Sequence, residues 1–152
     1  MKSANASGKD ERVPDRDDLA DFERLFARRP LHGRFEPNVD VWLDEAASSV
    51  VVSVELAGSD AESLRVMLED QELTIAGTRA PRDIPRTASL LRKEIQYGEF
   101  AKTLRLPAPV RDEGASALYR DGILTIRLPL AGTATHPVVR TTVRMTVRRT
   151  TV

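Results

Sequence analysis

Cysteine is absent from the 152-residue sequence, and histidine occurs only twice, as His32 and His136. Without cysteine the chain can form no disulfide bond, no thiolate nucleophile and no zinc site with sulfur ligands. Neither histidine has a second candidate ligand at metal spacing, and no serine stands in a Ser-His-Asp arrangement. There is also no glycine-rich phosphate loop. We therefore predict no catalytic residue, no metal, no cofactor and no small-molecule substrate, and hence no enzyme.

Long hydrophobic runs are missing as well. The densest apolar stretch, residues 50–56, is interrupted by Ser53 and Glu55 and is far too short to cross a bilayer. The first residues of the chain carry no apolar segment of the kind that a secretory signal needs. The sequence thus predicts a cytoplasmic protein without a transmembrane segment.

Charge of one sign is not in excess over the whole chain, because 23 basic residues balance 23 acidic ones. The end of the chain differs, since residues 137–152 contain four arginines and no acidic residue. This basic tail is either a solvated extension or a docking arm. No aromatic residue is interleaved with its arginines, so binding of nucleic acid is not expected.

Apolar residues recur with a period of two from residue 37 onward, which indicates β-strands with one buried face. The rows are Val39, Val41 and Leu43; Val50, Val52 and Val54; Leu64, Val66 and Leu68; Leu73 and Ile75; Phe100, Leu104 and Leu106; and Leu124, Ile126 and Leu128. No helical period separates the rows, which argues against a parallel fold with crossover helices. We predict an all-β, immunoglobulin-like antiparallel β-sandwich over residues 36–130.

Turn residues separate these rows. Asp121-Gly122 is a strong signal for a tight hairpin, because glycine tolerates positive φ and aspartate can bond to its own backbone. A second turn is expected at Asp70-Gln71, and Gly77 is expected to end the strand that follows it. Trp42 shares its strand face with acidic residues, so it is predicted either to lie in an interface or to be partly exposed.

Three further segments accompany the sandwich. Residues 1–35 are predicted to be an N-terminal arm, first disordered and then an amphipathic helix over residues 18–29. The apolar stripe of this helix consists of Leu19, Phe22, Leu25 and Phe26. Residues 78–96 form a long polar insertion with two prolines, and loops of this length are usually functional or mobile. Residues 131–152 are predicted to be a flexible C-terminal extension.

Four blocks of residues follow one another along the chain. They are Leu56-Ala57-Gly58; Leu73-Thr74-Ile75-Ala76-Gly77; Glu94 with Tyr97-Gly98-Glu99-Phe100, Lys102 and Leu106-Pro107; and Ala117 with Asp121-Gly122-Ile123-Leu124 and Pro129. Together they resemble the signatures of the α-crystallin domain of small heat-shock proteins. Two positions depart from the family's pattern: Ala57 replaces a proline, and Lys102 stands where the family often has arginine.

The resemblance implies an ATP-independent holdase chaperone, which binds partly unfolded client proteins and assembles from dimers into larger homo-oligomers. The arm stripe would then bind clients or pack inside the oligomer. In the bacterial and plant branch a long loop reaches the partner subunit, and residues 78–96 correspond to it. The residues on or beside this dimer loop would be Leu90, Leu91, Tyr97, Phe100 and Lys102. Lysine lacks the planar five-donor fork of arginine, so a weaker contact is expected at Lys102.

A tail anchor is also implied by the resemblance. The family's Ile-x-Ile pair docks in a groove of a neighbouring subunit, and this chain offers Val143-x-Met145 or Met145-x-Val147. A spacing of two projects both side chains to one face of an extended strand, as addition to a sheet edge requires. The accepting groove would be lined by Leu64, Val66 and Leu68 on one strand and by Ser116 and Leu118 on another.

One other function remains open from the residues, that of a monomeric β-sandwich co-chaperone or adaptor that binds a single folded partner. The amphipathic arm and the β-patterned tail argue against this alternative, because such modules rarely need both. Light scattering separates the two functions, since the adaptor would remain a monomer at micromolar concentration.

Overall fold

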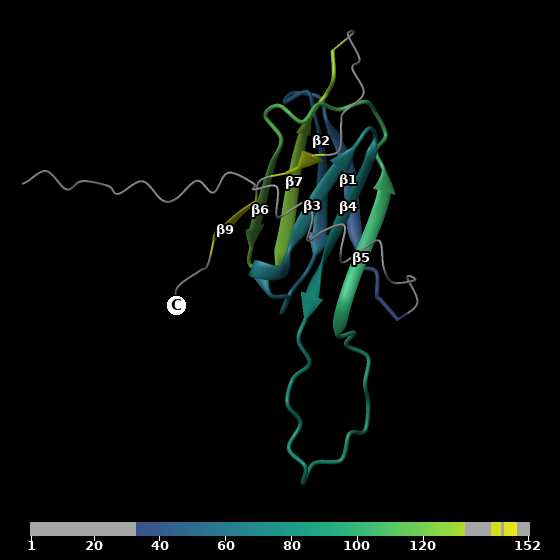
Figure 1. Ribbon diagram of the computed structural model, residues 1–152, viewed down its shortest axis with the longest axis vertical. Helices are drawn as coiled ribbons and strands as arrows, with labels where there is room; N and C mark the ends of the chain where they lie inside the picture. Colours follow the sequence, from purple (N-terminus) through teal and green to yellow (C-terminus); the bar gives the residue numbers. More distant parts are fainter. Residues whose placement is uncertain (1–32, 133–140, 144, 149–152) are drawn as a thin grey trace, which may run out of the picture.

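The computed structural model describes residues 33–132, 141–143 and 145–148, which fold into two stacked β-sheets (Figure 1). Sheet A has the strand order β5-β4-β3-β8, and sheet B has the order β1-β2-β7-β6-β9. The elements are β1 Val39–Asp44, β2 Ser49–Glu55, the 3₁₀-helix η1 Ala61–Ser63, β3 Arg65–Glu69, β4 Glu72–Arg79, β5 Gly98–Arg105, β6 Ser116–Arg120, β7 Ile123–Pro129, β8 Thr141–Thr142 and β9 Met145–Arg148. The predicted all-β sandwich is therefore confirmed, while the predicted helix of the arm lies outside the described residues.

The core lies between the inner faces of the two sheets. Sheet B contributes the alternate residues of β2 and β7, and sheet A contributes those of β3 and β4; all are nearly or fully buried: Val50, Val52, Val54, Leu124, Ile126, Leu128, Val66, Leu68, Leu73 and Ile75. Phe100 on β5 extends this cluster, and its ring centroid lies 5.3 Å from that of Phe35. Phe35 thus belongs to the core, although the sequence analysis counted it with the arm.

The Asp121-Gly122 hairpin is confirmed. Its two residues have φ angles of 52° and 80°, the left-handed values that a tight hairpin loop requires. The hairpin pairs Arg120 with Ile123 and Tyr119 with Leu124. This register decides which residues of β6 face the core, because side chains alternate between the two faces of a strand.

Gly77 does not end its strand, contrary to the prediction. β4 continues to Arg79, and Gly77 pairs with Phe100 in its interior. A Cβ atom at Gly77 would lie 2.7 Å from Cζ of Phe100 and 2.9 Å from Cδ2 of Leu64. The glycine is therefore needed for close packing beneath a phenylalanine ring and not for a turn. The loop that follows runs over residues 80–97, because residues 78 and 79 belong to the strand.

β1 also differs from its predicted pattern. Only Val39 packs against the core, whereas Val41 and Leu43 are 40% and 46% exposed. β1 is the end strand of sheet B, so its farther residues have too little of sheet A opposite them to be buried. Trp42 is 45% exposed in the single chain, which is compatible with both of its predicted alternatives.

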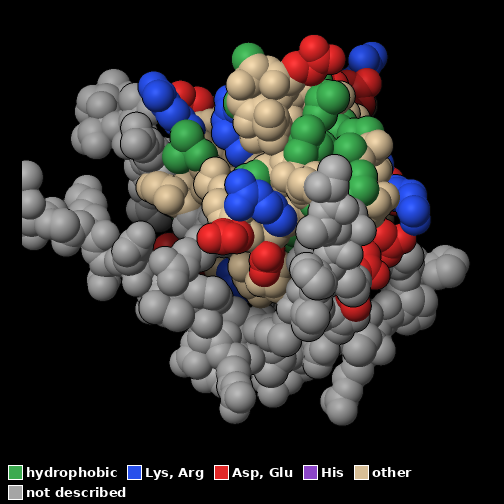
Figure 2. All heavy atoms as spheres, turned by 90° about the horizontal axis from the view of Figure 1, so that it is seen from above, with side chains coloured by type: hydrophobic (Ala, Val, Ile, Leu, Met, Phe, Trp, Pro, Cys, Tyr) green, Lys and Arg blue, Asp and Glu red, His purple; other side chains and the backbone are tan. Residues whose placement is uncertain are grey.

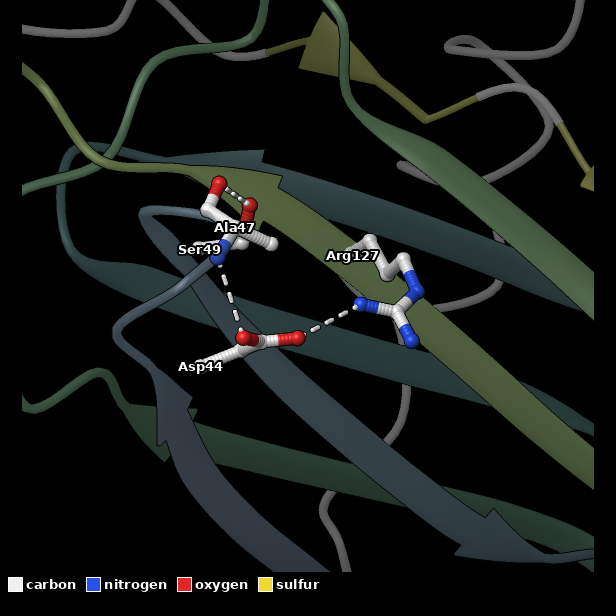
Figure 3. A network of polar contacts seen from close by, with 4 residues as sticks. All are labelled: Asp44, Ala47, Ser49 and Arg127. Carbon is white, nitrogen blue, oxygen red and sulfur yellow. Dashed lines mark hydrogen bonds and ion pairs between the residues drawn. The ribbon is translucent and has the colours of Figure 1, made fainter.

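A small polar network fixes the end of β1 to the strands beside it (Figure 3). Asp44 Oδ2 pairs with Arg127 Nη1 on β7 at 3.3 Å, across the intervening strand β2. Its other oxygen, Oδ1, accepts a hydrogen bond of 3.0 Å from the backbone N–H of Ala47, and the Ser49 hydroxyl donates to the Ala47 carbonyl. The two oxygens of the Asp44 carboxylate thus join the β1–β2 turn to β7.

Candidate functional site

The tail segment, residues 141–143 and 145–148, lies against the edges of both sheets (Figure 1). β8 pairs antiparallel with β3, which places Thr142 opposite Met67. β9 then pairs parallel with β6, which places Met145 opposite Ala117 and Val147 opposite Tyr119. One extended segment therefore crosses from sheet A to sheet B along the open side of the sandwich between β3 and β6.

Val143 is the residue of the tail segment that enters the core. Its side chain is 5% exposed within the core cluster, and its backbone N–H donates to the Val66 carbonyl at 2.9 Å. Val147 is only partly buried. The site holds an extended strand by backbone pairing on both sides and by burial of one apolar side chain between them.

The walls of this groove are partly those expected from the sequence. Leu64, Val66 and Leu68 are buried on the β3 side. On the β6 side the expected residues are wrong, because Ser116 is exposed and Leu118 has the outward phase of the strand. Ala117 and Tyr119 face inward instead, since the hairpin register pairs them with Ile126 and Leu124, which are core residues. A shift of one residue exchanges the two faces of a strand, and the two-residue loop at Asp121-Gly122 was the signal for the correct phase.

Tyr119 ties the groove to the residue that follows β2, beside the Asp121-Gly122 hairpin. Its hydroxyl donates to the Leu56 carbonyl at 2.9 Å. Burial raises the pKa of Tyr119, and the positive charge of Arg79 offsets part of this rise. Tyr119 therefore stays protonated, and able to donate this hydrogen bond, into the alkaline range.

Tyr119→Phe should reduce the loss of stability at alkaline pH. The unfolded chain releases the tyrosine proton near pH ~10, and the folded chain holds it more tightly. The stabilising contribution is thus complete below that pH and is lost as the pH rises through the higher pKa of the folded chain. At neutral pH the variant should lose about 1 kcal/mol, the usual value of one hydrogen bond. Urea unfolding from neutral to strongly alkaline pH measures both effects, and an equal alkaline decline in both proteins would contradict the assignment.

The loop over residues 80–97 carries apolar side chains away from the sandwich, below the ends of β4 and β5 in Figure 1. Leu91 is 95% exposed, and Ile84, Leu90 and Ile95 are each more than half exposed. Tyr97, at the end of the loop, is half-buried. Leu90 and Leu91 are thus placed where a second chain can reach them.

The two other residues assigned to the dimer loop lie on β5. Phe100 is 1% exposed and packs inside its own sandwich, so it is a core residue and cannot contact a partner. Lys102 pairs with Ile75 and therefore points to the inner side of this edge strand. Its Nζ atom lies 2.7 Å from Glu36 Oε2, a single contact where an arginine fork could make two.

Arg79 joins the base of the loop to the start of the sandwich, a role that the sequence analysis missed. Its guanidinium carbon lies 5.0 Å from the centroid of the Phe35 ring, within the range of a cation–π contact. Its Nη1 atom also donates to the Gln96 carbonyl at 3.3 Å. The residue stands in a polar stretch after Gly77, and no local pattern sets it apart from the arginines of the loop that follows.

The outer edge of β1 is a second surface that can accept a strand. The N–H of Glu55 donates to the Asn38 carbonyl at 3.0 Å, and the register pairs Val39 with Val54. In an antiparallel pair the backbone groups alternate in direction, so those of Val41 and Leu43 point away from β2. Seen from the end opposite the long loop, apolar side chains lie in small groups among charged ones (Figure 2). β1 therefore combines exposed apolar side chains with an open backbone edge.

Several residues singled out in the sequence lie outside the described part of the chain. The stripe of Leu19, Phe22, Leu25 and Phe26 falls outside the described residues, as do both histidines. Within the described ranges no three His, Asp or Glu side chains come together where a metal ion could bind. The described part of the chain also contains no helix that is long and apolar enough to span a membrane.

Comparison with known proteins finds relatives among proteins named heat shock protein or alpha-crystallin. A probable 15 kDa heat shock protein from Leptospira interrogans is 31% identical over 93 residues, which cover 61% of this chain and 68% of the relative. A Mycobacterium bovis protein named alpha-crystallin is 30% identical over 118 residues, which cover 73% of this chain and 78% of the relative. Both alignments extend over most of the relative's length.

Solved structures agree with these sequence matches. The hspA structure from Xanthomonas axonopodis matches with a TM-score of 0.56 at 29% identity, over 64% of this chain and 95% of the other. Heat shock protein 16.0 from Schizosaccharomyces pombe matches with a TM-score of 0.55 at 26% identity, over 70% of this chain and 99% of the other. The profile of the Hsp20/alpha crystallin family matches residues 42–143, from β1 through the buried Val143. That match includes strands β2 to β8 and the buried Val143, so the chain belongs to the Hsp20/alpha crystallin family of small heat shock proteins.

Proposed function

We propose that this chain is an ATP-independent holdase, which binds partly unfolded proteins and keeps them from aggregating. The observation that carries the proposal is the groove between β3 and β6, where an extended segment is held by its backbone and by one buried apolar side chain, Val143. Backbone pairing does not depend on sequence, so the same groove suits many extended apolar segments. Small heat shock proteins are non-enzymatic chaperones, which supports the proposal.

Clients would compete with the tail for this groove. An unfolded chain exposes apolar side chains and unpaired backbone groups together, and strand addition satisfies both. The stripe of Leu19, Phe22, Leu25 and Phe26 would add a second apolar surface, either for clients or for packing between subunits. Because burial of apolar surface has no direction, such contacts give broad specificity.

Subunits would pair through the long loop and the edge of β1. The loop of one subunit carries exposed Leu90 and Leu91, and the edge strand of the other offers Val41, Trp42 and Leu43. An exposed, apolar edge strand is prone to pair with any available strand, so a partner loop laid along it would protect it. Tails that occupy the groove of a neighbouring subunit would then join dimers into larger homo-oligomers.

Leu91→Asp should weaken the dimer. Burying a leucine side chain at an interface contributes about 1.5–3 kcal/mol, so the dimer dissociation constant should rise roughly tenfold to a hundredfold. The fold should be unaffected, because Leu91 is 95% exposed in the single chain. Sedimentation equilibrium measures the dissociation constant. Ala88→Asp, an equal charge at another exposed position of the loop, is the matched control, and equal effects of the two variants would argue against this interface.

The chaperone activity is tested by heating an aggregation-prone protein with the full chain in a buffer without ATP. At equimolar subunits the turbidity should stay low, and turbidity equal to that of the client alone would exclude a holdase. The alternative, a monomeric adaptor for one folded partner, predicts a monomer in light scattering and no protection of unrelated clients. The location in the cytoplasm remains a prediction from the sequence.

A further inference from the structure

The outer face of sheet A has an uncharged centre. Alternation along β3, β4 and β5 directs one set of side chains away from the core, and the strand register brings these into rows. One row holds Met67, Thr74 and Thr103, and the next holds Ala76 and Ala101 beside Arg65. We name the uncharged residues of these rows the outer patch: Met67, Thr74, Ala76, Ala101 and Thr103.

The apolar side chains of the outer patch are covered, although they lie outside the core. Met67, Ala76 and Ala101 are only 7%, 4% and 7% exposed, although none of them belongs to the core cluster. The two threonine hydroxyls lie 3.0 Å apart and bond to each other, which lowers the cost of covering them. The small alanines leave room for bulky side chains to approach the sheet, and methionine adapts its shape to what packs on it. Charged residues stand around this centre: Arg65, Glu69, Glu72, Glu99 and Arg105.

The chain enters the sandwich beside this face. Phe35 forms a parallel bridge with Phe100 at the edge of β5, where its N–H donates to the Glu99 carbonyl and its own carbonyl accepts from the N–H of Ala101. Arg34 Nε lies 3.3 Å from Glu99 Oε2. Glu99 pairs with Thr78 and has the phase of Ala101, so its side chain is on the outer side of β5. The first described residues are thus tied to the same side of sheet A as the outer patch.

We propose that residues 18–29 dock, as an amphipathic helix, on the outer patch of their own subunit, with Leu19, Phe22, Leu25 and Phe26 against it. Residues 30–34 connect this segment to Phe35, and five extended residues span roughly 17 Å. Two strand spacings, from β5 to β3, amount to only about 10 Å, so the connection is long enough. A helix of this length is marginal by itself and requires a packing partner.

Docking within the subunit would cover the stripe and the outer patch at the same time. Release of the helix would expose both, and this consequence rests on the proposed holdase function. The docking itself does not, because it can be measured without any client.

Engineered cysteines test the contact directly, since the chain has none of its own. In the full chain, Phe22→Cys combined with Thr74→Cys should form an intrachain disulfide on mild oxidation. The control pair is Phe22→Cys with Thr125→Cys, because Thr125 lies on the outer face of sheet B. If the helix prefers the outer patch to the outer face of sheet B by only ~1.4 kcal/mol, the first pair should cross-link about tenfold faster than the second. Equal rates, or a disulfide that forms only between two chains, would overturn the proposal.

A second variant gives an independent readout. Thr74→Glu places a charge at the centre of the outer patch, which should release the helix and speed cleavage by trypsin after Arg24 or Arg28 about tenfold, by the same ~1.4 kcal/mol. Thr125→Glu is the matched control and should leave cleavage unchanged. Cleavage that is equally fast in Thr74→Glu and in the unmodified chain would contradict docking on this face.

Discussion

Val143→Asp should reduce the assembled protein to dimers. The variant loses the burial of a valine and must desolvate a carboxylate between the two sheets, where Val143 is 5% exposed. Loss of the apolar contact alone costs about 2 kcal/mol, so docking of the tail should weaken by at least roughly thirtyfold. Tails that no longer dock cannot join one dimer to another, whereas the loop contact is left intact. Size-exclusion chromatography with light scattering gives the mass of the remaining species.

Thr146→Asp is the control for this experiment. Thr146 belongs to the same tail segment and pairs with Leu118, but its side chain is exposed. The same charge at this position should leave the assembly unchanged. If Val143→Asp also keeps the full assembly, or if Thr146→Asp disrupts it equally, the tail does not join subunits through the β3–β6 groove.

Gly77→Ala should destabilise the sandwich strongly for so small a change. The added methyl group would lie 2.7 Å from Cζ of Phe100 and 2.9 Å from Cδ2 of Leu64, and Phe100 is 1% exposed. Overpacking of this kind typically costs about 1–3 kcal/mol, because the core has no room into which the ring can move. The midpoint and slope of urea unfolding give the change in the free energy of unfolding.

Two further variants separate overpacking from a general effect of alanine. Gly132→Ala is the control, because an added Cβ at that glycine meets no atom within 4 Å. Phe100→Leu in the Gly77→Ala background should recover part of the loss, so that the two changes are less than additive. Strict additivity, or a neutral Gly77→Ala, would mean that the ring does not restrict this position.

The hairpin and the central strands could be predicted from the sequence because local and tertiary preferences agree there. Asp121-Gly122 suits only a tight turn, and the rows of β2 and β7 lie in the middle of sheet B, covered by the opposite sheet. Val41 and Leu43 have the same alternation and are exposed, because periodicity reports the pleat of a strand and not what lies opposite it. Gly77 shows the same limit, since a glycine that ends a strand and one that admits a ring look alike in sequence.

The candidate site was predictable only in outline. The alternation in the tail indicated a strand that could pair with an edge, but the faces of β6 depended on a register set by the hairpin, and Ser116 and Leu118 were assigned to the wrong one. Alternation already placed Phe100 on a buried face, and only its assignment to the dimer loop was wrong. Local sequence does not indicate that Arg79 reaches both Phe35 and Gln96, since these contacts join segments far apart in the chain. The sequence also could not indicate that the tail segment docks in the groove of its own subunit, because a strand pattern does not specify which copy of the chain it will join.

The most direct test of the central claim is the mass of what forms when the full chain and a thermolabile client are heated together after enzymatic removal of ATP. The account predicts that the client stays in solution and elutes with the chain, in a complex larger than either protein alone. A client that sediments as completely as it does without the chain, while the chain elutes at its own mass, would contradict the account.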